Sequence, residues 1–242
     1  MNNKLGILIP ARMESVRFPG KPLAPIAGTP MVLYCAENAK KTGYPTYVCT
    51  DSKDILSVCK THDVNCIKTP QFNTGTDRVA WSAKELGLEF IVNLQGDEPL
   101  ITSQNIGFFI KKLLDSQNEI DKIQCGVTKI GPKEAFDPNN VKCAISFEMN
   151  KILYFSRKPL LCNDDDDLEP YFKQIGLYGM TFRNLHHFTS LEQGKLELCE
   201  NVELLRWIEN DKIVDPCLLN VKNISVDSPA DLYCVNKILN ES

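Results

Sequence analysis

The chain has 242 residues, of which 43% are hydrophobic and 24% are charged, and its formal net charge is −4. These values are ordinary for a soluble globular protein, and the length is sufficient for a substantial core. The slight negative charge argues against a nucleic-acid coat protein, and no apolar run approaches the roughly 20 residues of a membrane span. We therefore treat residues 1–242 as a single domain and expect neither a nucleic-acid nor a membrane partner. An anionic ligand would need a local basic site.

The N-terminal sequence and the cysteines indicate the cellular compartment in which we expect the protein. The sequence from Met1 onward goes directly into strand-like residues and lacks the features of a signal peptide, so we expect a cytoplasmic protein. The ten cysteines are scattered and include no CxxC pair, which argues against the usual zinc and redox motifs. Several stand in apolar segments, so we interpret them as small buried hydrophobic residues in a reducing compartment. Disulfides are the alternative.

The most informative stretch follows the first predicted strand. Residues 5–9 are an apolar run typical of a fully buried strand in an α/β sheet. The next segment is rich in proline and glycine, which predicts irregular structure, and it carries Arg12, Arg17 and Lys21. Open α/β sheets bind ligands at loops of this kind, and three cations beside free backbone N–H groups would suit a polyphosphate. A solvated basic loop is the alternative.

Apolar spacing and turn residues predict further elements in the first half of the chain. In chain order we expect a helix from Pro30, a strand at 45–50, a helix capped by Asp51 or Ser52, a strand at 64–67, a helix after 73–78 and a strand at 89–94. Strands that alternate with helices up to residue 116 predict a parallel, doubly wound sheet.

The second half has a different character. We expect an antiparallel pair at 141–147 and 152–155, a strand at 175–182, a helix over 202–208, mixed strand and loop at 213–221, and a final helix that opens at 226–232. The four aspartates within 163–169 indicate an exposed acidic loop, with metal binding as the alternative. His186 and His187 have no partner at metal-ligand spacing, so we interpret both as surface residues.

Two polar turns are candidates for binding. The turn at 73–78 leads into a helix, and its Gly75 would permit close approach of a ligand to the backbone. Asp97 and Glu98 follow a buried strand, and carboxylates beside phosphate are the usual protein contribution to a Mg²⁺ site. An ordinary capped turn is the alternative for the first, and a plain polar turn for the second. Asp227 precedes the final helix, where capping is its simplest role.

These motifs together resemble a known family. The chain is similar to the 3-deoxy-manno-octulosonate cytidylyltransferases (CMP-Kdo synthetases) over nearly its whole length, in the family's motif order. The motifs that carry the resemblance are PAR-x-x-S-x-R-x-PGKPL at 10–23, NTGTDR at 73–78, QGDEP at 95–99, AFDPNNVK at 135–142, YFSR at 154–157 and VDSPADL at 226–232.

The resemblance implies a fold and a reaction. The fold would be the α/β, doubly wound, mostly parallel sheet of nucleotide-diphospho-sugar transferases, with a smaller antiparallel region used in dimerisation. The enzyme would transfer CMP from CTP to the anomeric hydroxyl of an acidic 3-deoxy sugar, 3-deoxy-manno-octulosonate (Kdo), and release pyrophosphate. Mg²⁺ would be the cofactor and a homodimer the assembly. The product would serve lipopolysaccharide or capsule biosynthesis.

The resemblance also implies roles for individual residues. Catalysis would rest on Lys21, Arg12 and Asp97, and Asp97 and Asp227 would hold the metal. The nucleotide would contact Ala11, Arg12, Ser15, Arg17, Lys21, Thr74, Gly75 and Arg78. The sugar side would include Gln95, Arg157, Gln174, Tyr178 and Glu203.

Two positions depart from the family pattern. Gln174 stands where the family commonly has a histidine, and Leu204 replaces a polar residue of the late helix. A site built to hydrogen-bond hydroxyls discriminates strongly among sugars, so these changes could alter the accepted sugar. The alternatives are therefore the same chemistry on an amino-Kdo or a nonulosonate, or a catalytically silent nucleotide-binding protein.

Overall fold

The computed structural model describes residues 4–15, 17–115, 121–160 and 171–241. The elements in chain order are β1 (Leu5–Pro10), the 3₁₀ helix η1 (Lys21–Leu23), β2 (Pro25–Ile26), β3 (Thr29–Pro30), α1 (Met31–Lys40), β4 (Thr46–Thr50), α2 (Lys53–Thr61), β5 (Cys66–Lys68), α3 (Gly75–Glu85), β6 (Phe90–Leu94), α4 (Ser103–Asp115), β7 (Lys122–Lys129), α5 (Pro132–Ala135), β8 (Lys142–Ser146), β9 (Lys151–Ser156), β10 (Phe172–Thr181), α6 (Phe182–Ser190), α7 (Lys195–Glu200), α8 (Leu204–Glu209), β11 (Ile213–Leu218) and α9 (Pro229–Asn240).

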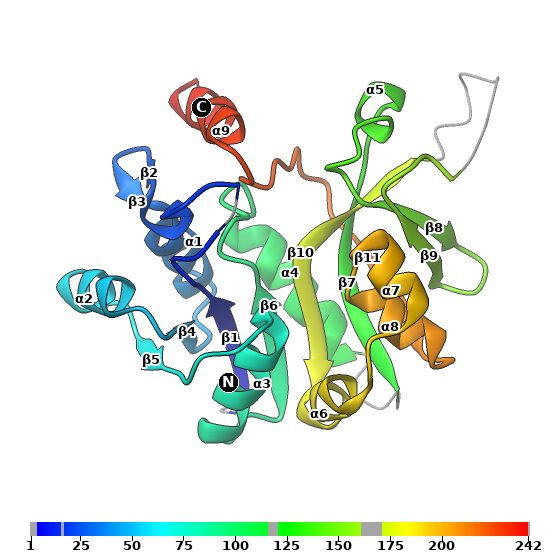
Figure 1. Ribbon diagram of the computed structural model, residues 1–242, viewed down its shortest axis with the longest axis horizontal. Helices are drawn as coiled ribbons and strands as arrows, with labels where there is room; N and C mark the ends of the chain where they lie inside the picture. The colour runs from blue at the N-terminus through cyan, green and yellow to red at the C-terminus, as the bar shows by residue number, and fades with distance from the viewer. Residues whose placement is uncertain (1–3, 16, 116–120, 161–170, 242) are drawn as a thin grey trace.

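A nine-stranded sheet runs through the molecule in the order β11-β7-β10-β6-β1-β4-β5, with β8 and β9 attached through β10 (Figure 1). β1 is parallel to both β4 and β6, whereas β10 is antiparallel to β6 and β7. The chain order reverses at β1, which leaves a crevice at the carboxyl ends of β1 and β6. The prediction of a mostly parallel, doubly wound sheet is confirmed.

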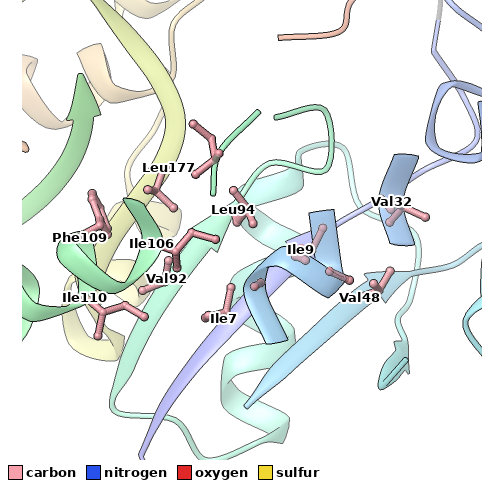
Figure 2. Packing of buried hydrophobic residues seen from close by; sticks show 14 of the residues in the cluster. Ile7, Ile9, Val32, Val48, Val92, Leu94, Ile106, Phe109, Ile110 and Leu177 are labelled. Atoms are coloured by element: carbon pink, nitrogen blue, oxygen red, sulfur yellow. The ribbon is translucent and has the colours of Figure 1, made fainter. Parts of the chain in front are cut away.

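Helices cover both faces of the sheet, and the central strand β1 is accordingly apolar at nearly every position. Ile7 and Ile9 pack against α1 and α4 on one face, and Figure 2 shows them beside Val32, Val92 and Ile106. Leu8 points to the other face, where α3, α6 and α8 pack. Each fully buried isoleucine or leucine contributes roughly 1.5–3 kcal/mol. The edge that carries the site is therefore built on β1, whose residues are all buried, and on β6, which is buried except at Phe90.

The segment before α9 returns the C-terminal part of the chain to the carboxyl end of β6. It runs across the upper edge of the sheet between α5 and α9 in Figure 1. The Val226 N–H donates to the Asp97 carbonyl at 2.9 Å, and Val226 is fully buried beside Ile26 and Val235. This docking places Asp227 directly over the loop that follows β1.

The smaller antiparallel region is the hairpin β8–β9, and β8 also pairs with β10. The predicted strand pair is confirmed. Its turn and outer strand expose Phe147, Met149 and Leu153 to solvent.

Several elements differ from the sequence-based expectation. The segment after β1 contains η1 and the small β2–β3 pair as well as irregular backbone. Gly20, at φ +74°, precedes η1, and Pro22 lies in the first turn of this 3₁₀ helix. The third strand lies two residues later than expected, at Cys66–Lys68. The sequence analysis did not place β7, α5, α6 or α7.

The structure shows how far the histidines and cysteines are exposed. His186 is exposed as expected, but His187 is half-buried and packs edge-on against Trp207, with ring centroids 5.3 Å apart. Among the described residues the cysteines are free, and most are buried, whereas Cys199 and Cys234 are exposed. Cys162 and the predicted acidic loop at 163–169 lie outside the described residues.

In the described part of the chain, each helix is too short or too polar to cross a membrane.

Candidate active site

Two cavities adjoin at the carboxyl ends of β1 and β6. We call them the basic cavity, about 490 Å³ and lined by Arg12, Arg17, Lys21 and Arg78, and the acidic cavity, about 500 Å³. Both volumes suit small-molecule ligands. The carboxylates that line the acidic cavity belong to Asp97, Glu98, Glu134, Asp137, Glu203, Asp227 and Asp231. The residues common to both cavities are Gly75, Gln95, Asp97, Asn201 and Asp227.

An ion-pair cluster stands at the border between the cavities. Lys21 Nζ lies 2.6 Å from Asp97 Oδ2 and 3.2 Å from Asp227 Oδ1. An Arg17 guanidinium nitrogen lies 3.1 Å from the same Asp227 oxygen. Burial alone would lower the pKa of Lys21, but the two carboxylates outweigh burial and raise it, so Lys21 stays charged.

Every residue predicted to contact the nucleotide lines the basic cavity. Ala11 and Arg12 follow β1, Ser15 and Arg17 lie further along the same loop, and Lys21 begins η1. The others are Thr74, which caps α3, and Gly75 and Arg78 within α3. Arg12 is exposed, and its Nη1 donates to the Asn73 carbonyl at 3.4 Å, which ties the two loops together.

The N-terminus of α3 closes this cavity from the opposite side. The Thr74 hydroxyl oxygen accepts from the Asp77 N–H at 3.0 Å, so the capped-turn interpretation holds for Thr74. A Cβ on Gly75 would lie 3.4 Å from the Pro10 ring, and this close approach brings the first turn of α3 against the end of β1. Free N–H groups at a helix N-terminus favour an anion, so the capped turn is also suited to binding phosphate.

Arg78 has a different environment from the other cations. Its side chain is almost fully buried, pairs with Asp51 at 3.0 Å and donates to the Thr69 hydroxyl. Although Arg78 lines the basic cavity, these bonds join α3 to the loops after β4 and β5. The structure therefore shows Arg78 bracing the cavity wall.

The two adjacent carboxylates after β6 point in different directions. Asp97 lies at the border of the cavities, whereas Glu98 is 3% exposed and accepts hydrogen bonds from Gly176 and from residues before α9. Burial and the charge of Asp97 raise the pKa of Glu98 to about 7, although its hydrogen bonds oppose the shift. The doublet therefore supplies one carboxylate, Asp97, to the border between the cavities, and the second carboxylate at the border is Asp227.

A bulge in β10 shapes the acidic cavity. The pairing of β10 with β7 shifts between Gln174 and Tyr178, and Gln174 Nε2 donates to the Tyr178 hydroxyl at 2.7 Å. Within the bulge, a Cβ on Gly176 would lie 2.8 Å from both Gln95 Cβ and Glu98 Oε1, so only glycine fits. Burial raises the pKa of Tyr178, which keeps its hydroxyl protonated and able to donate.

The other residues predicted for the sugar side also line the acidic cavity. Gln95 donates from Nε2 to Asn93 Oδ1 at 3.1 Å and reaches both cavities. Glu203 accepts from the Thr76 hydroxyl, and burial raises the pKa of Glu203. Thr76, which lies within the turn at 73–78, also lines the cavity, although no role was predicted for it individually.

The two cations of the acidic cavity are largely engaged by the protein. Arg157 donates to the carbonyls of Glu200, Pro138 and Asn201 at 2.8, 3.1 and 3.3 Å. Lys173, which the sequence reading missed, is buried and donates to the Asn223 carbonyl at 2.7 Å and to Asn140. Burial lowers the pKa of Lys173.

The border between the cavities offers two carboxylates as donors for a divalent cation. Asp97 and Asp227 both contact the Lys21 ammonium, so their carboxylates converge on one cationic point. Within the described residues, no cluster of three or more His, Cys, Asp or Glu side chains could complete a metal site. Mg²⁺ is characteristically bound by one or two carboxylates together with substrate phosphates and water, and this donor set matches that pattern.

The carboxylates of Asp97 and Asp227 have cations on one side, in the basic cavity, and hydrogen-bonding side chains on the other, in the acidic cavity. This arrangement suits an enzyme that joins a nucleotide to a second polar substrate. This arrangement on a doubly wound sheet places the chain among the α/β nucleotidyltransferases. The family model described as "Cytidylyltransferase" matches residues 6–214. The chain belongs to the cytidylyltransferase family, in the group formed by 3-deoxy-manno-octulosonate cytidylyltransferases and their 8-amino counterparts, as the resemblance predicted.

Three comparisons illustrate this relationship. The chain is 35% identical to 8-amino-3,8-dideoxy-manno-octulosonate cytidylyltransferase of Shewanella sp. (strain ANA-3), over 93% of this chain and 94% of that protein. It is 34% identical to 3-deoxy-manno-octulosonate cytidylyltransferase of Chloroherpeton thalassium, over 98% of both. The solved structure of CMP:2-keto-3-deoxy-manno-octonic acid synthetase complexed with CTP matches with a TM-score of 0.90 at 27% identity, covering 98% of this chain and 99% of that chain.

Proposed function

We propose that this chain transfers CMP from CTP to the anomeric hydroxyl of Kdo, giving CMP-Kdo and pyrophosphate. The observation that carries the proposal is the shared border of the two cavities, where Lys21, Asp97 and Asp227 meet. A nucleotide in the basic cavity and a sugar in the acidic cavity would meet at this border. The names of the relatives support the choice of both substrates.

The basic cavity would hold the triphosphate. Arg12, Arg17 and Lys21 offset its charge, and the N-terminal turn of α3 offers backbone N–H donors. As pyrophosphate departs, negative charge grows on its oxygens, and Lys21 with Arg12 stabilise that charge. We therefore assign Lys21 and Arg12 to catalysis as well as to binding.

The acidic cavity would orient the sugar. Gln95, Gln174, Tyr178 and Glu203 can hydrogen-bond its hydroxyls, and Arg157 retains donor capacity beyond its three carbonyl partners. The anomeric oxygen then forms a bond to the α-phosphorus while the bond to the bridging oxygen breaks. The electron pair leaves with pyrophosphate, and the hydroxyl proton passes to solvent. Positioning and charge stabilisation supply most of the rate enhancement in this type of transfer.

We propose Mg²⁺ as the cofactor, held by Asp97 and Asp227. A bound Mg²⁺ would polarise the α-phosphate and gather oxygens of both substrates. Because carboxylates outnumber cations along the acidic cavity, an acidic sugar needs additional positive charge near the border. The two aspartates place that charge where both substrates would be within reach.

The test is pyrophosphate release from purified protein supplied with CTP, Mg²⁺ and Kdo. Release that depends on all three, with CMP-Kdo identified by mass spectrometry, supports the proposal. Calorimetry that detects CTP binding, together with no turnover of any acidic sugar, would instead favour a silent nucleotide-binding protein.

An 8-amino-Kdo is the second candidate for the sugar. Gln174 departs from the family pattern, and relatives 35% identical to the chain are named for the amino sugar. The carboxylate-rich acidic cavity would also favour an ammonium group on the substrate. Comparing kcat/KM for Kdo, 8-amino-Kdo and a nonulosonate separates these substrates, and a Gln174→His variant tests whether this position sets the preference.

We further propose a cytoplasmic homodimer whose product enters lipopolysaccharide or capsule biosynthesis. The β8–β9 hairpin exposes Met149 and Leu153, which a second subunit could cover. Light scattering should give twice the chain mass, and Met149→Glu with Leu153→Glu should halve it. Phe108→Glu, an equally exposed apolar residue on α4, serves as the control and should leave the mass unchanged.

A further inference from the structure

A buried hydrogen-bond network joins three parts of the site through Glu98. Glu98 Oε1 accepts from the Gly176 N–H at 2.7 Å and from the Ser225 hydroxyl at 2.8 Å. Its Oε2 accepts from Asn223 Nδ2 at 2.8 Å. One side chain thus connects the turn after β6, the bulge of β10 and the segment before α9.

The segment before α9 is held at Asn223 through both the backbone and the side chain of this residue. Lys173 of β10 donates to the Asn223 carbonyl at 2.7 Å, while Glu98 binds the Asn223 side chain. The Val226 N–H then donates to the Asp97 carbonyl at 2.9 Å. Asp227 follows directly, so its carboxylate projects from a segment pinned to the turn that carries Asp97.

We propose that Glu98 is a positioning residue that fixes the separation of the Asp97 and Asp227 carboxylates and thereby the affinity of the border site for a divalent cation. This inference rests on the proposed function, which assigns Asp97 and Asp227 to the metal. Glu98 faces away from the border and does not itself touch the cation. Residues that orient metal ligands typically change metal affinity by roughly 10- to 100-fold when they are removed.

The network predicts different outcomes for two substitutions of Glu98. Glu98→Ala removes the acceptors for Gly176, Ser225 and Asn223 together. Glu98→Gln keeps one oxygen for Gly176 and Ser225, but its amide nitrogen would face the Asn223 amide nitrogen. Asn223 Oδ1 is buried and has no hydrogen-bond partner, so rotation of the Asn223 amide presents an acceptor to the new donor. Glu98→Gln should therefore retain most of the affinity for a divalent cation that Glu98→Ala loses.

The experiment measures Mn²⁺ binding to the full chain in the presence of CTP, by electron paramagnetic resonance, and in parallel the apparent KM for Mg²⁺. Glu98→Ala should weaken Mn²⁺ binding by roughly 10-fold or more, whereas Glu98→Gln should stay within about 3-fold of the wild type. Ser225→Ala removes a single bond and is the milder second variant; it should give an intermediate loss. Asn184→Ala is the matched control, because Asn184 Nδ2 makes a buried bond to the Lys122 carbonyl at the opposite end of the sheet.

The outcomes separate this inference from the proposed function. Wild-type Mn²⁺ affinity in Ser225→Ala and in folded Glu98→Ala would overturn the positioning role while leaving the proposed metal site intact. An equal loss in the Asn184→Ala control would overturn it as well, because the effect would then be general destabilisation. If wild-type protein with CTP binds no Mn²⁺ saturably, the metal assignment itself fails, and the inference fails with it.

Discussion

Lys21 Nζ lies 2.6 Å from Asp97 Oδ2, and this contact joins the loop after β1 to the turn after β6. The same ammonium reaches Asp227, so residues from three distant parts of the chain meet at one point. Lys21 is 15% exposed and Asp97 27% exposed, which leaves the cluster open to a ligand from either cavity. Electrostatic interactions at a partly buried site are screened less than on the open surface.

Replacement of Lys21 should weaken the handling of CTP. A hydrogen bond to a charged group contributes about 1.5–3 kcal/mol, so Lys21→Ala should raise the KM for CTP by roughly 10-fold or more and lower kcat. The KM for the sugar should change little. Steady-state kinetics with each substrate varied in turn measures the effect. Lys4→Ala removes an exposed ion pair with Glu89 and is the control; unchanged CTP kinetics in Lys21→Ala would mean that the loop is only surface.

Loss of the Asp97 charge should abolish turnover while the fold persists. Asp97→Asn removes one of the two carboxylates at the border, and we expect kcat to fall by about 100-fold or more. Circular dichroism should be unchanged because Asp97 is not part of the core. Asp121→Asn, which removes an ion pair with Lys212 far from the cavities, should retain full activity. Near-normal turnover by Asp97→Asn would contradict the assigned role.

Two glycine substitutions should have opposite effects on stability. Gly176→Ala places a Cβ 2.8 Å from Gln95 Cβ, so we expect a loss of about 1–3 kcal/mol and a reduced kcat/KM for the sugar. Gly107→Ala in α4 meets no atom within 4 Å and should stabilise the protein by about 0.5–1 kcal/mol. Urea denaturation measures both. An unchanged free energy of unfolding in Gly176→Ala would contradict this account, because it would show that the bulge adjusts to the added methyl group.

The ion pair between Glu197 and Arg206 should make stability depend on acid pH. Arg206 donates to both Glu197 oxygens at 2.7 Å. Burial alone would raise the pKa of Glu197, but the bonds from Arg206 outweigh it and lower the pKa below its ordinary value of 4.5. The pair therefore stabilises the fold above pH 4.5, and this contribution is lost as the pH falls through the folded-state pKa.

Glu197→Gln should consequently lower the free energy of unfolding by about 3–5 kcal/mol at neutral pH. The difference from the wild type should shrink below pH 4.5. Chemical denaturation across a pH series measures this, and a difference independent of pH would contradict the ion-pair account.

The sequence predicted those parts of the fold that depend on local pattern. β1 is apolar at nearly every position because both of its faces are covered, and such a run is recognisable without a structure. β7 was not placed because it carries Gln124 and Thr128 in its interior. Gln124 bonds to the Phe109 carbonyl and Thr128 to the Val221 carbonyl, and these partners are distant in the sequence.

In the site, too, local sequence pattern predicted some features, whereas others depend on contacts between distant residues. Adjacent carboxylates at a strand end predicted a polar site, but nothing local separates Asp97 from Glu98. Glu98 turns away because its partners Asn223 and Ser225 lie 125 and 127 residues further along the chain. The engagement of Arg157 with backbone carbonyls is likewise a property of tertiary packing that no local motif encodes.

The most direct measurement is the rate of pyrophosphate release by the wild-type protein and by Asp97→Asn, with CTP and Mg²⁺, in the presence and absence of Kdo or 8-amino-Kdo. We expect release by the wild-type protein only when an acidic sugar is present, one CMP-sugar formed for each pyrophosphate, and almost none by Asp97→Asn. Pyrophosphate release without a sugar, or equal rates for both proteins, would contradict transfer at the border of the two cavities.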